Sequence, residues 1–374
     1  MKLQVIQEDL SKALSLAGRF VNQRAQLPIL GNILLSAKKT KLSLLATNLE
    51  VSLALSIGAR VETEGEITIP ARTAIDLFSS LPAKNITLES DKEQLKISSE
   101  GFSGTISGMN SSEFPSVPQV LGKLASSLPK DKFLEAANQV VFAASNDETR
   151  PVLMGILFLF DNDNLVLIST DGFRLSQKKV SLDKKVKLGQ MIIPKNSLSE
   201  LIRIGGSSNQ TLAVESKSAD NQVLFGLGSV VLTTRVIEGE FPDFERIIPK
   251  ESPVKVFLNR EDFLSGIKTA SVFARDSANI VKLIIQENGF SISAESSKSG
   301  KEAMDIEAKI EGLSASGREK VFEISYNFRF VEEFLNNVKG EEVQMEFSNS
   351  SSPGVFRDSS DTSFLHLIMP VKIN

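Results

Sequence analysis

The stretch ITIPARTAIDLFSSL at 67–81 decides the fold class. Its opening residues are β-rich, Pro70 ends the run, and apolar residues then recur at helical spacing. The same pattern returns in MIIPKNSLSELIRI at 191–204 and in FEISYNFRFVEEFL at 322–335. The first two stretches have a proline at this point, Pro70 or Pro194, which suits both a strand end and a first helical turn because it lacks a backbone N–H. Each stretch therefore predicts a strand that leads directly into an amphipathic helix.

Each of these stretches has an earlier companion with helical periodicity, at 8–17, 131–141 and 261–270. The equivalent leucines, Leu10, Leu134 and Leu264, are separated by 124 and 130 positions. Three units of about 125 residues thus account for all 374 residues. Strand-like runs at 42–57, 165–180 and 290–306 lie between the helices. The chain therefore reads as three copies of an α+β unit with two helices and antiparallel sheet.

The units are separated by loop-like segments near 118–123 and 249–253. We expect domains at 1–120, 121–250 and 251–374. Repeated domains form arcs, and head-to-tail interfaces between arcs can close into a ring. The edge strands at the two ends of such an arc need a pairing partner. A linear scaffold built from the same repeats would show the same sequence pattern.

Composition excludes several classes of chemistry. The chain has no Cys and one histidine, so disulfides, thiolate catalysis and multi-histidine metal sites are excluded. His366 lies in the apolar run FLHLIMP, which indicates a strand residue rather than a general base. The net charge is −4, so contact with nucleic acid would need a local basic surface. The absence of a membrane span and of a secretion signal favours a cytoplasmic protein.

Four motifs in order resemble one known family. They are LPILGN at 27–32, STDGFRL at 169–175, FPDFERIIP at 241–249 and IMP at 368–370. Together with the threefold repeat they make the chain similar, over its whole length, to the beta subunit of bacterial DNA polymerase III, the replicative sliding clamp. The family usually has His where this chain has Phe173.

The resemblance implies a fold and a function. The implied fold is three DNA-clamp domains, each with antiparallel sheets outside and two helices inside, in a ring-shaped head-to-tail homodimer. Duplex DNA would thread the ring without sequence readout, and the clamp would tether the polymerase without catalytic chemistry of its own. The implied partners are the DNA polymerase III alpha subunit, the clamp loader and other replication and repair proteins, bound through short linear peptides. No cofactor, metal or membrane is implied.

The resemblance also implies three sets of site residues, placed here by matching positions. Apolar side chains suit an adaptable peptide groove, and arginines at its rim would hold peptide carbonyls or a carboxylate. The partner-peptide cleft would comprise Leu153, Thr170, Gly172, Phe173, Arg174, Leu175, Pro242, Arg246, Ile247, Leu367, Met369, Pro370, Val371 and Lys372. The DNA-binding residues would be Arg24, Arg72, Lys195 and Arg203, and the dimer interface would include Ile106, Val272 and Phe273. We expect Val272 and Phe273 just past a helix, and Ile106 on an edge strand facing them.

Two other interpretations remain open at this stage. A scaffold that does not bind DNA would also fit a pI of about 5.5. A hydrolase or transferase would have to use carboxylates such as Asp171 and Asp243. Asp171 precedes a glycine, which is ordinary turn chemistry. DNA-dependent retention would separate the clamp from the scaffold.

Overall fold

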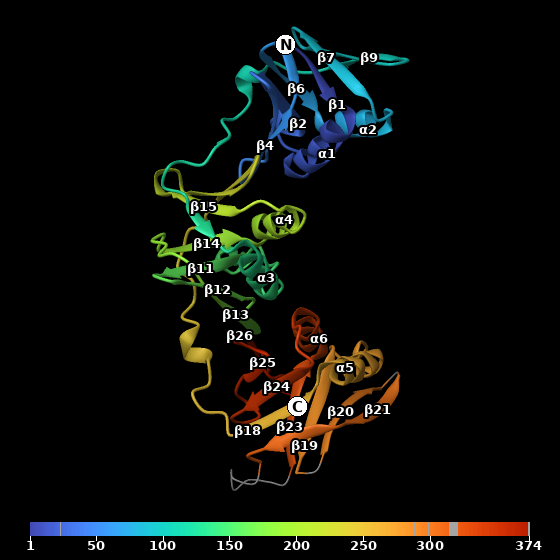
Figure 1. The fold of residues 1–374 in the computed structure, drawn as a ribbon. Coiled ribbons are helices and arrows are strands. Elements are labelled where there is room, and N and C mark those ends of the chain that lie inside the picture. The colour runs from blue at the N-terminus through green and yellow to red at the C-terminus, as the bar shows by residue number, and fades with distance from the viewer. Residues whose placement is uncertain (23, 288, 298, 314–320, 373–374) are drawn as a thin grey trace. The chain divides into compact units, whose positions relative to one another are not determined.

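The chain folds into two compact units. The structure is a computed structural model that describes residues 1–22, 24–287, 289–297, 299–313 and 321–372. The first unit comprises Met1–Lys130 and Arg203–Val236, and the second comprises Asp131–Ile202 and Ile237–Asn374. Figure 1 labels most of the helices and strands of both units. All strand pairs described below are antiparallel.

The first unit contains two sheets. The larger has the strand order β10 (Ser126–Leu128), β15 (Leu212–Lys217), β16 (Gln222–Leu227), β17 (Val230–Arg235), β4 (Val51–Gly58), β3 (Lys41–Thr47), β2 (Asn32–Lys38), β6 (Gly65–Pro70). The smaller has the order β5 (Arg60–Thr63), β1 (Lys2–Ile6), β7 (Asn85–Asp91), β8 (Gln94–Ser99), β9 (Phe102–Ser107). Helices α1 (Gln7–Ala17) and α2 (Ala71–Ser80) pack on each other, and α1 also packs on β3 and β4.

The predicted strand-to-helix stretch at 67–81 is confirmed. Residues up to Pro70 form β6, and α2 begins at the next residue. β6 lies at the edge of the larger sheet, where Pro70 pairs with Asn32, and a missing N–H is tolerated there. Ala74 and Phe78 recur at four-residue spacing and are fully buried on one face of α2.

The second unit also contains two sheets. The larger has the strand order β14 (Gln190–Pro194), β11 (Gly155–Asp161), β12 (Asn164–Thr170), β13 (Arg174–Ser181), β26 (Asp361–Ile368), β25 (Gly354–Asp358), β24 (Glu342–Phe347), β18 (Val254–Asn259), β22 (Ala308–Glu311). The smaller has the order β21 (Gly300–Ile306), β20 (Gly289–Ser296), β19 (Ile280–Gln286), β23 (Val321–Asn327). Each strand-rich run predicted at 165–180 and 290–306 is a hairpin, and so is the run at 42–57 in the first unit.

The remaining predicted helices are α3 (Lys130–Val141), α4 (Lys195–Gly206), α5 (Arg260–Ala274) and α6 (Phe328–Asn337). Asparagine side chains cap the last two. Asn259 accepts the backbone N–H of Glu261 at 2.8 Å, and Asn327 accepts that of Arg329 at 3.0 Å. These caps fix where α5 and α6 begin. None of the helices in the described ranges is long and apolar enough to cross a membrane.

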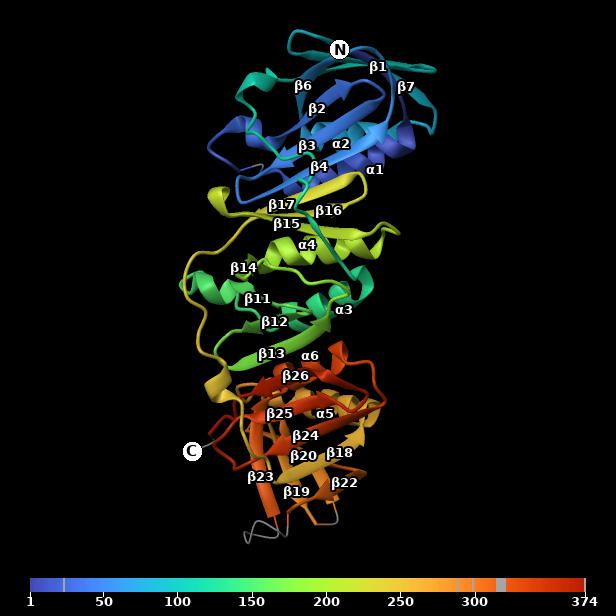
Figure 2. The ribbon, with the colours of Figure 1, turned by 60° about the vertical axis from the view of Figure 1, so that its left-hand side comes forward.

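Two strand pairs join consecutive repeats of the sequence. β4 of the first repeat pairs with β17 of the middle repeat, and β13 of the middle repeat pairs with β26 of the last. Figure 2 shows each pair side by side. The middle repeat thus contributes strands to both large sheets, which explains why three sequence repeats fold into two compact units.

Phenylalanines supply much of the core, as their number predicts. Of the twelve largest fully buried side chains in the described residues, eleven are Phe and the other is Tyr326. In the last repeat, Phe334 of α6 stacks on Phe364 and meets Phe356 edge to face. Phe173 is different, because 59% of it is exposed. A phenylalanine left at the surface suggests a contact outside the core.

Candidate functional site

An apolar pocket lies at one end of the β13–β26 strand pair, in the second unit. Its volume is about 200 Å³. Nine of its eleven lining residues belong to the predicted peptide cleft: Leu153, Thr170, Gly172, Arg174, Leu175, Pro242, Ile247, Leu367 and Met369. The other two, Asp243 and Phe244, were not predicted. The structure thus brings together residues that are up to 216 positions apart in the sequence, from Leu153 to Met369.

A tight turn between β12 and β13 shapes one wall of this pocket. The Asp171 carboxylate accepts the backbone N–H groups of Phe173 and Arg174 at 2.9 and 3.0 Å. Gly172 has a φ of +92°, a conformation that glycine adopts without strain. The Phe173 carbonyl accepts the N–H of Met369 at 2.9 Å, which ties the turn to the end of β26. The turn therefore presents the exposed Phe173 ring beside the pocket.

The opposite wall comes from the segment that carries FPDFERIIP. Phe241, Phe244 and Ile248 pack on the outer face of the large sheet, which positions the residues between them. Ile247 remains 41% exposed at the pocket. Arg246 is 84% exposed and pairs with Asp243 at 2.6 Å. A charged pair at the rim of an apolar hollow is suited to an amphipathic ligand.

Arg174 lines the pocket and also makes contacts that were not predicted. Its guanidinium donates to the Asp171 carboxylate at 3.0 Å, to Glu333 at 2.6 Å and to the Phe142 carbonyl at 2.9 Å. The group lies over the ring of Phe330 and is only 8% exposed. These contacts use only part of its hydrogen-bonding capacity, because a guanidinium has five N–H donors. Its contact with peptide carbonyls stays a prediction, and its bond to Glu333 links β13 to α6.

Five predicted cleft residues are absent from the pocket lining. They are Phe173, Arg246, Pro370, Val371 and Lys372. Val371 donates its N–H to the carbonyl of Ser325 in β23, so the segment after β26 follows the last repeat. The chain beyond Lys372 lies outside the described residues.

The predicted DNA contacts differ in how available they are. Arg24 and Arg72 are exposed, and Arg72 lies 4.0 Å from Asp76 on the next turn of α2. Lys195 is half-buried and donates to the carbonyl of Ala144 and the side chain of Asn146, both at 3.0 Å. Burial lowers its pKa, and the charge of nearby Arg174 adds to this effect. Since an ammonium has three N–H donors, Lys195 keeps one for another partner.

The predicted interface residues require two corrections. Val272 and Phe273 lie within α5 rather than past its end. Val272 is 59% exposed, whereas Phe273 packs partly on the core. Ile106 does lie on β9, an edge strand, but its side chain is 5% exposed and belongs to the core of the first unit. Ile106 therefore offers little apolar surface to a second chain, because strand alternation points it inward.

The carboxylates considered for catalysis have structural partners. Asp171 accepts two backbone N–H groups and the Arg174 guanidinium, as turn chemistry predicts. His366 is fully buried in β26, as expected for a strand residue. In the ranges that the structure describes, no group of three or more His, Cys, Asp or Glu side chains could hold a metal ion.

Comparison with known proteins matches this architecture from end to end. Models of the DNA polymerase III beta subunit match at 1–118 for its N-terminal domain, 127–243 for its central domain and 245–372 for its C-terminal domain. The chain belongs to the DNA polymerase III beta subunit family. Its function is that of a DNA sliding clamp for this polymerase.

Relatives of known name support the family assignment. The beta sliding clamp of Synechocystis is 30% identical over 398 residues and covers 100% of both chains. That of Staphylococcus epidermidis is 29% identical over 363 residues, 94% of each chain. The solved sliding clamp of Bacillus subtilis is 27% identical with a TM-score of 0.94 over 100% of both chains. A clamp structure from Bartonella birtlesii, bound to griselimycin, is 27% identical with a TM-score of 0.92 over 100% of both chains.

Two lining residues of this family member were missed from the sequence. Asp243 and Phe244 stand inside the quoted motif FPDFERIIP, between the predicted Pro242 and Arg246. Their position between Pro242 and Arg246 was the signal that could have found them. When residues on both sides of a short segment are predicted to line a pocket, the residues between them are expected to lie against it too. Nothing in the sequence indicated that the Arg174 guanidinium would also pair with Glu333 of α6.

Proposed function

We propose that the chain forms a head-to-tail homodimeric ring around duplex DNA and tethers DNA polymerase III and other proteins without catalysing a reaction. The apolar pocket at the β13–β26 end carries this proposal, because a tether needs a place to hold its partners. We place its action in the cytoplasm. We keep the domain limits 1–120, 121–250 and 251–374, which the three matched ranges support.

The pocket suits a short linear peptide with apolar anchors. Leu153, Leu367 and Met369 provide apolar surface, and methionine adapts to different side chains. Phe173 and Ile247 extend this surface at the mouth, where both are exposed. The alpha subunit, the clamp loader and repair proteins would compete for the site. Griselimycin, bound in the Bartonella birtlesii relative, is a practical probe for it.

DNA retention tests the clamp function directly. The purified protein is loaded onto nicked circular DNA with a clamp loader, and the DNA is then linearised. We expect the protein to remain on the circle and to leave once an end is available, because topology rather than affinity holds a ring. Retention that is the same on both forms would contradict the ring. No loading at all, with peptide binding intact, would favour the scaffold that does not bind DNA.

Three of the predicted phosphate contacts, Arg24, Arg72 and Arg203, are exposed, and the first two are used for the test. We expect Arg24→Ala with Arg72→Ala to weaken DNA binding equally for all sequences and to reduce the slope of log K against log salt by about 2, or ~0.9 per phosphate contact. A filter-binding titration between low and moderate salt measures this slope. The control is Lys41→Ala with Lys309→Ala, two exposed lysines outside the predicted contacts. Equal slopes for the two double variants would remove both arginines from the interface.

The dimer interface would join two of the free sheet edges. β9 ends the smaller sheet of the first unit, and β21, on which α5 packs, ends that of the second. Pairing of β9 with β21 of another copy would satisfy both edges. Val272, exposed on α5, would lie at this interface.

Val272→Asp is therefore expected to dissociate the dimer. Sedimentation at micromolar concentration should move from about twice the chain mass of 40.8 kDa to that of one chain. The buried aspartate would lose hydration without gaining a partner, at a cost of several kcal/mol. Val120→Asp, at a residue that is 75% exposed in the first unit, is the control and should stay dimeric. A dimeric Val272→Asp would move the interface elsewhere.

A further inference from the structure

The two strand pairs that join the repeats begin from the same turn. Thr47 and Thr170 each accept the N–H of the second residue after them, at 3.0 Å in both turns, and each donates to the carbonyl of the fourth, Val51 or Arg174. β4 and β13 therefore align residue by residue from these positions. The two turns therefore fix which residue of β4 corresponds to which residue of β13.

The aligned residues differ sharply in chemistry. Val51, Leu53 and Leu55 of β4 correspond to Arg174, Ser176 and Lys178 of β13. Across the pairs, Leu53 faces Leu232 of β17, whereas Ser176 faces His366 of β26. The first link is thus apolar at positions where the second is polar. We call the second set, Arg174, Ser176 and Lys178 with Glu333, His366 and Asp361, the polar seam.

Polar contacts run along the whole seam. The Ser176 hydroxyl lies 2.7 Å from Nδ1 of His366 at its centre. Arg174 pairs with Glu333 at 2.6 Å at one end, and Lys178 pairs with Asp361 at the other. A buried ion pair gains little over apolar packing, because each ion loses its hydration. The seam therefore stabilises the junction less than the leucines do at the first link.

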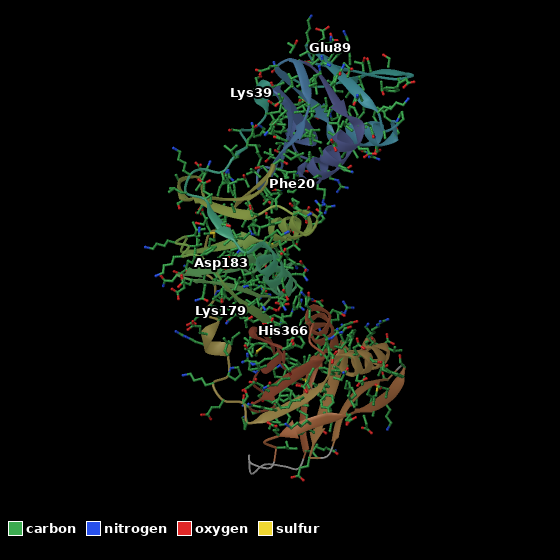
Figure 3. The ribbon with its side chains drawn as sticks, in the orientation of Figure 1. Phe20, Lys39, Glu89, Lys179, Asp183 and His366 are labelled. Atoms are coloured by element: carbon green, nitrogen blue, oxygen red, sulfur yellow. The ribbon has the colours of Figure 1, made fainter. Side chains whose placement is uncertain are left out.

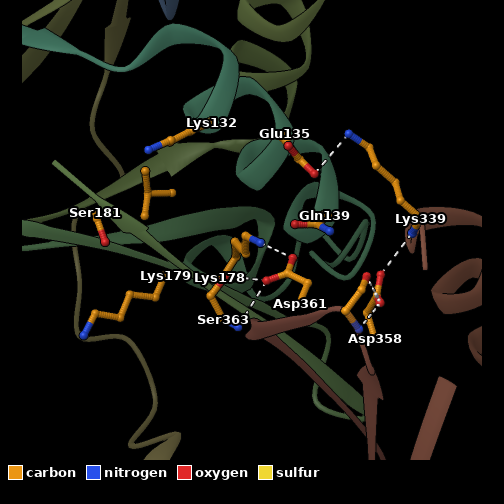
Figure 4. Close-up of a pocket in the computed structure, with 12 residues that line it drawn as sticks. Lys132, Glu135, Gln139, Lys178, Lys179, Ser181, Lys339, Asp358, Asp361 and Ser363 are labelled. Carbon is orange, nitrogen blue, oxygen red and sulfur yellow. Dashed lines mark hydrogen bonds and ion pairs between the residues drawn. The ribbon is translucent and has the colours of Figure 1, made fainter. Parts of the chain in front are cut away.

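A polar cavity of about 460 Å³ lies beside the Lys178 end of the seam. Figure 4 shows Glu135 of α3 reaching Lys339, which follows α6, and Lys178 reaching Asp361. Eleven of its twelve lining residues are polar or charged. The apolar pocket lies at the Arg174 end of the same strand pair. The junction is thus hollow at both ends, and less packing is lost when it moves.

Three buried polar atoms at this junction have no hydrogen-bond partner in the part of the chain that the structure describes. They are Oε1 of Gln139, Oε1 of Gln177 and Nε2 of His366. Gln139 is 3% exposed and lines the polar cavity (Figure 4), and Figure 3 marks His366 on β26. A buried polar atom without a partner penalises the closed state, and water would satisfy all three on opening. The β4–β17 link has one such atom, Oγ1 of Thr233, and its opening would also expose Leu53 and Leu232 to water.

We propose that the polar seam between β13 and β26 is the joint at which this chain bends, and that β4–β17 is its rigid link. On the face that carries the seam residues, opening hydrates ions and unpaired polar atoms, and on the other face it exposes the paired Leu175 and Leu367. Opening of the rigid link exposes leucine and valine on the matching face and hydrates no ion. Changes in the angle between repeats therefore concentrate at the seam. For a protein that must open and close around another molecule, this places the compliant point next to the apolar pocket.

His366, the one histidine of the chain, allows the joint to be measured. Burial lowers its pKa well below the ordinary value, and the charge of Arg174 adds to this. Arg174 is the charged group that acts on it directly. The other charged groups of the seam and of the elements beside it are Lys178 from β13, Glu333 from α6, Asp361 from β26, Asp358 from β25, Glu135 from α3, Lys339, Asp171 and Lys195. Only the open state takes up a proton at neutral to mildly acid pH. Acid therefore favours opening as pH falls below about 6.5.

Burial alone would raise the pKa of Asp361 and Asp358, but hydrogen bonds outweigh it and lower both. Lys178 and Ser363 donate to Asp361, and Ser360 and Gly340 donate to Asp358. These two carboxylates stay ionised between pH 5.5 and 7.5. A pH response in that window is consequently assigned to His366.

Hydrogen exchange on the full chain tests the proposal. Protection factors are compared for amides of 174–178 and 364–368 and for the matched control segments 51–55 and 230–234. At pH 7.5 we expect the seam to be at least ten-fold less protected than the control. Between pH 6.5 and 5.5 we expect seam protection to fall by up to about ten-fold, and control protection to stay constant. Equal protection of the two links, or an equal pH response, would overturn the proposal.

A transplant variant tests the cause. Ser176→Leu with His366→Leu installs the Leu53–Leu232 pair of the rigid link. We expect the seam of this variant to gain at least ten-fold protection and to lose its pH response. If the variant does not fold, His366→Asn replaces it, and its pH response alone should vanish. A pH response that survives His366→Asn would contradict the role of His366. The location of the joint is tested separately, by the difference in protection between the two links of the unmodified chain.

Discussion

Replacement of Arg174 by alanine is expected to lower the free energy of unfolding of the second unit by about 3 kcal/mol, at the low end for removing one partner of a buried ion pair. The loss has several parts. The carboxylates of Asp171 and Glu333 lose their cation, and the Phe142 carbonyl loses a donor. The Phe330 ring loses the guanidinium that lies over it. Glu333 is 44% exposed and partly recovers hydration, which keeps the effect from being larger.

Urea unfolding, followed by tyrosine fluorescence, measures this change in the free energy of unfolding. The chain has no Trp and one Tyr, Tyr326, which is fully buried in the second unit. Tyrosine fluorescence therefore reports that unit alone. The matched control is Arg246→Ala, which also removes an arginine beside the pocket, but one that is 84% exposed. It should change stability by less than ~1 kcal/mol. Equal effects for the two variants would mean that the buried contacts of Arg174 do not stabilise the second unit.

The second large effect is expected on ligand binding. Ile247→Glu with Met369→Glu should weaken binding of an alpha-subunit peptide at least 100-fold, about 3 kcal/mol. Both side chains line the pocket and are partly exposed, at 41% and 37%. The new charges can face water in the free protein but would be desolvated under an apolar ligand. Leu175 is unsuitable for such a test, because it is 1% exposed and its replacement by Glu would unfold the sheet.

Titration of a labelled peptide, followed by fluorescence anisotropy, measures the affinity, with griselimycin as a competing ligand. Val321→Glu is the matched control, because Val321 is also 37% exposed but lies on β23, outside the pocket lining. It should bind the peptide as the unmodified chain does. Unchanged affinity in the double variant, with normal tyrosine unfolding, would remove this pocket from the proposed function. The hydrogen-exchange test of the joint uses no ligand and is unaffected by that result.

The local elements could be predicted from the sequence because their causes are local. Apolar spacing placed the six α-helices of the described residues to within a few positions, and Pro70 and Pro194 marked strand ends. The pair Asp171 and Gly172 predicted a turn, because an aspartate side chain binds the backbone N–H groups that follow it and glycine accepts a positive φ. Both effects depend on neighbours in the sequence. Matching of positions to the family also indicated nine of the eleven residues around the pocket.

The directions of side chains depend on partners that are distant in the sequence. Arg174 is adjacent to the pocket in sequence and in space, yet its guanidinium turns to Glu333, which is 159 positions away. Ile106 lies on the predicted edge strand, but its side chain is buried in the core. Whether a charge or an apolar group faces water is set by what packs against it, and that is decided only when the sheets close.

The repeats themselves show this division most clearly. The sequence by itself determined three copies of one α+β unit, because periodicity and turn residues act within each copy. The tertiary structure alone decided that the copies share sheets, and that aligned strands carry leucine at one junction and an arginine–serine–lysine series at the other. Such a difference has meaning only when the facing strand is known, because the cost of burying an ion or an apolar side chain depends on the groups across from it.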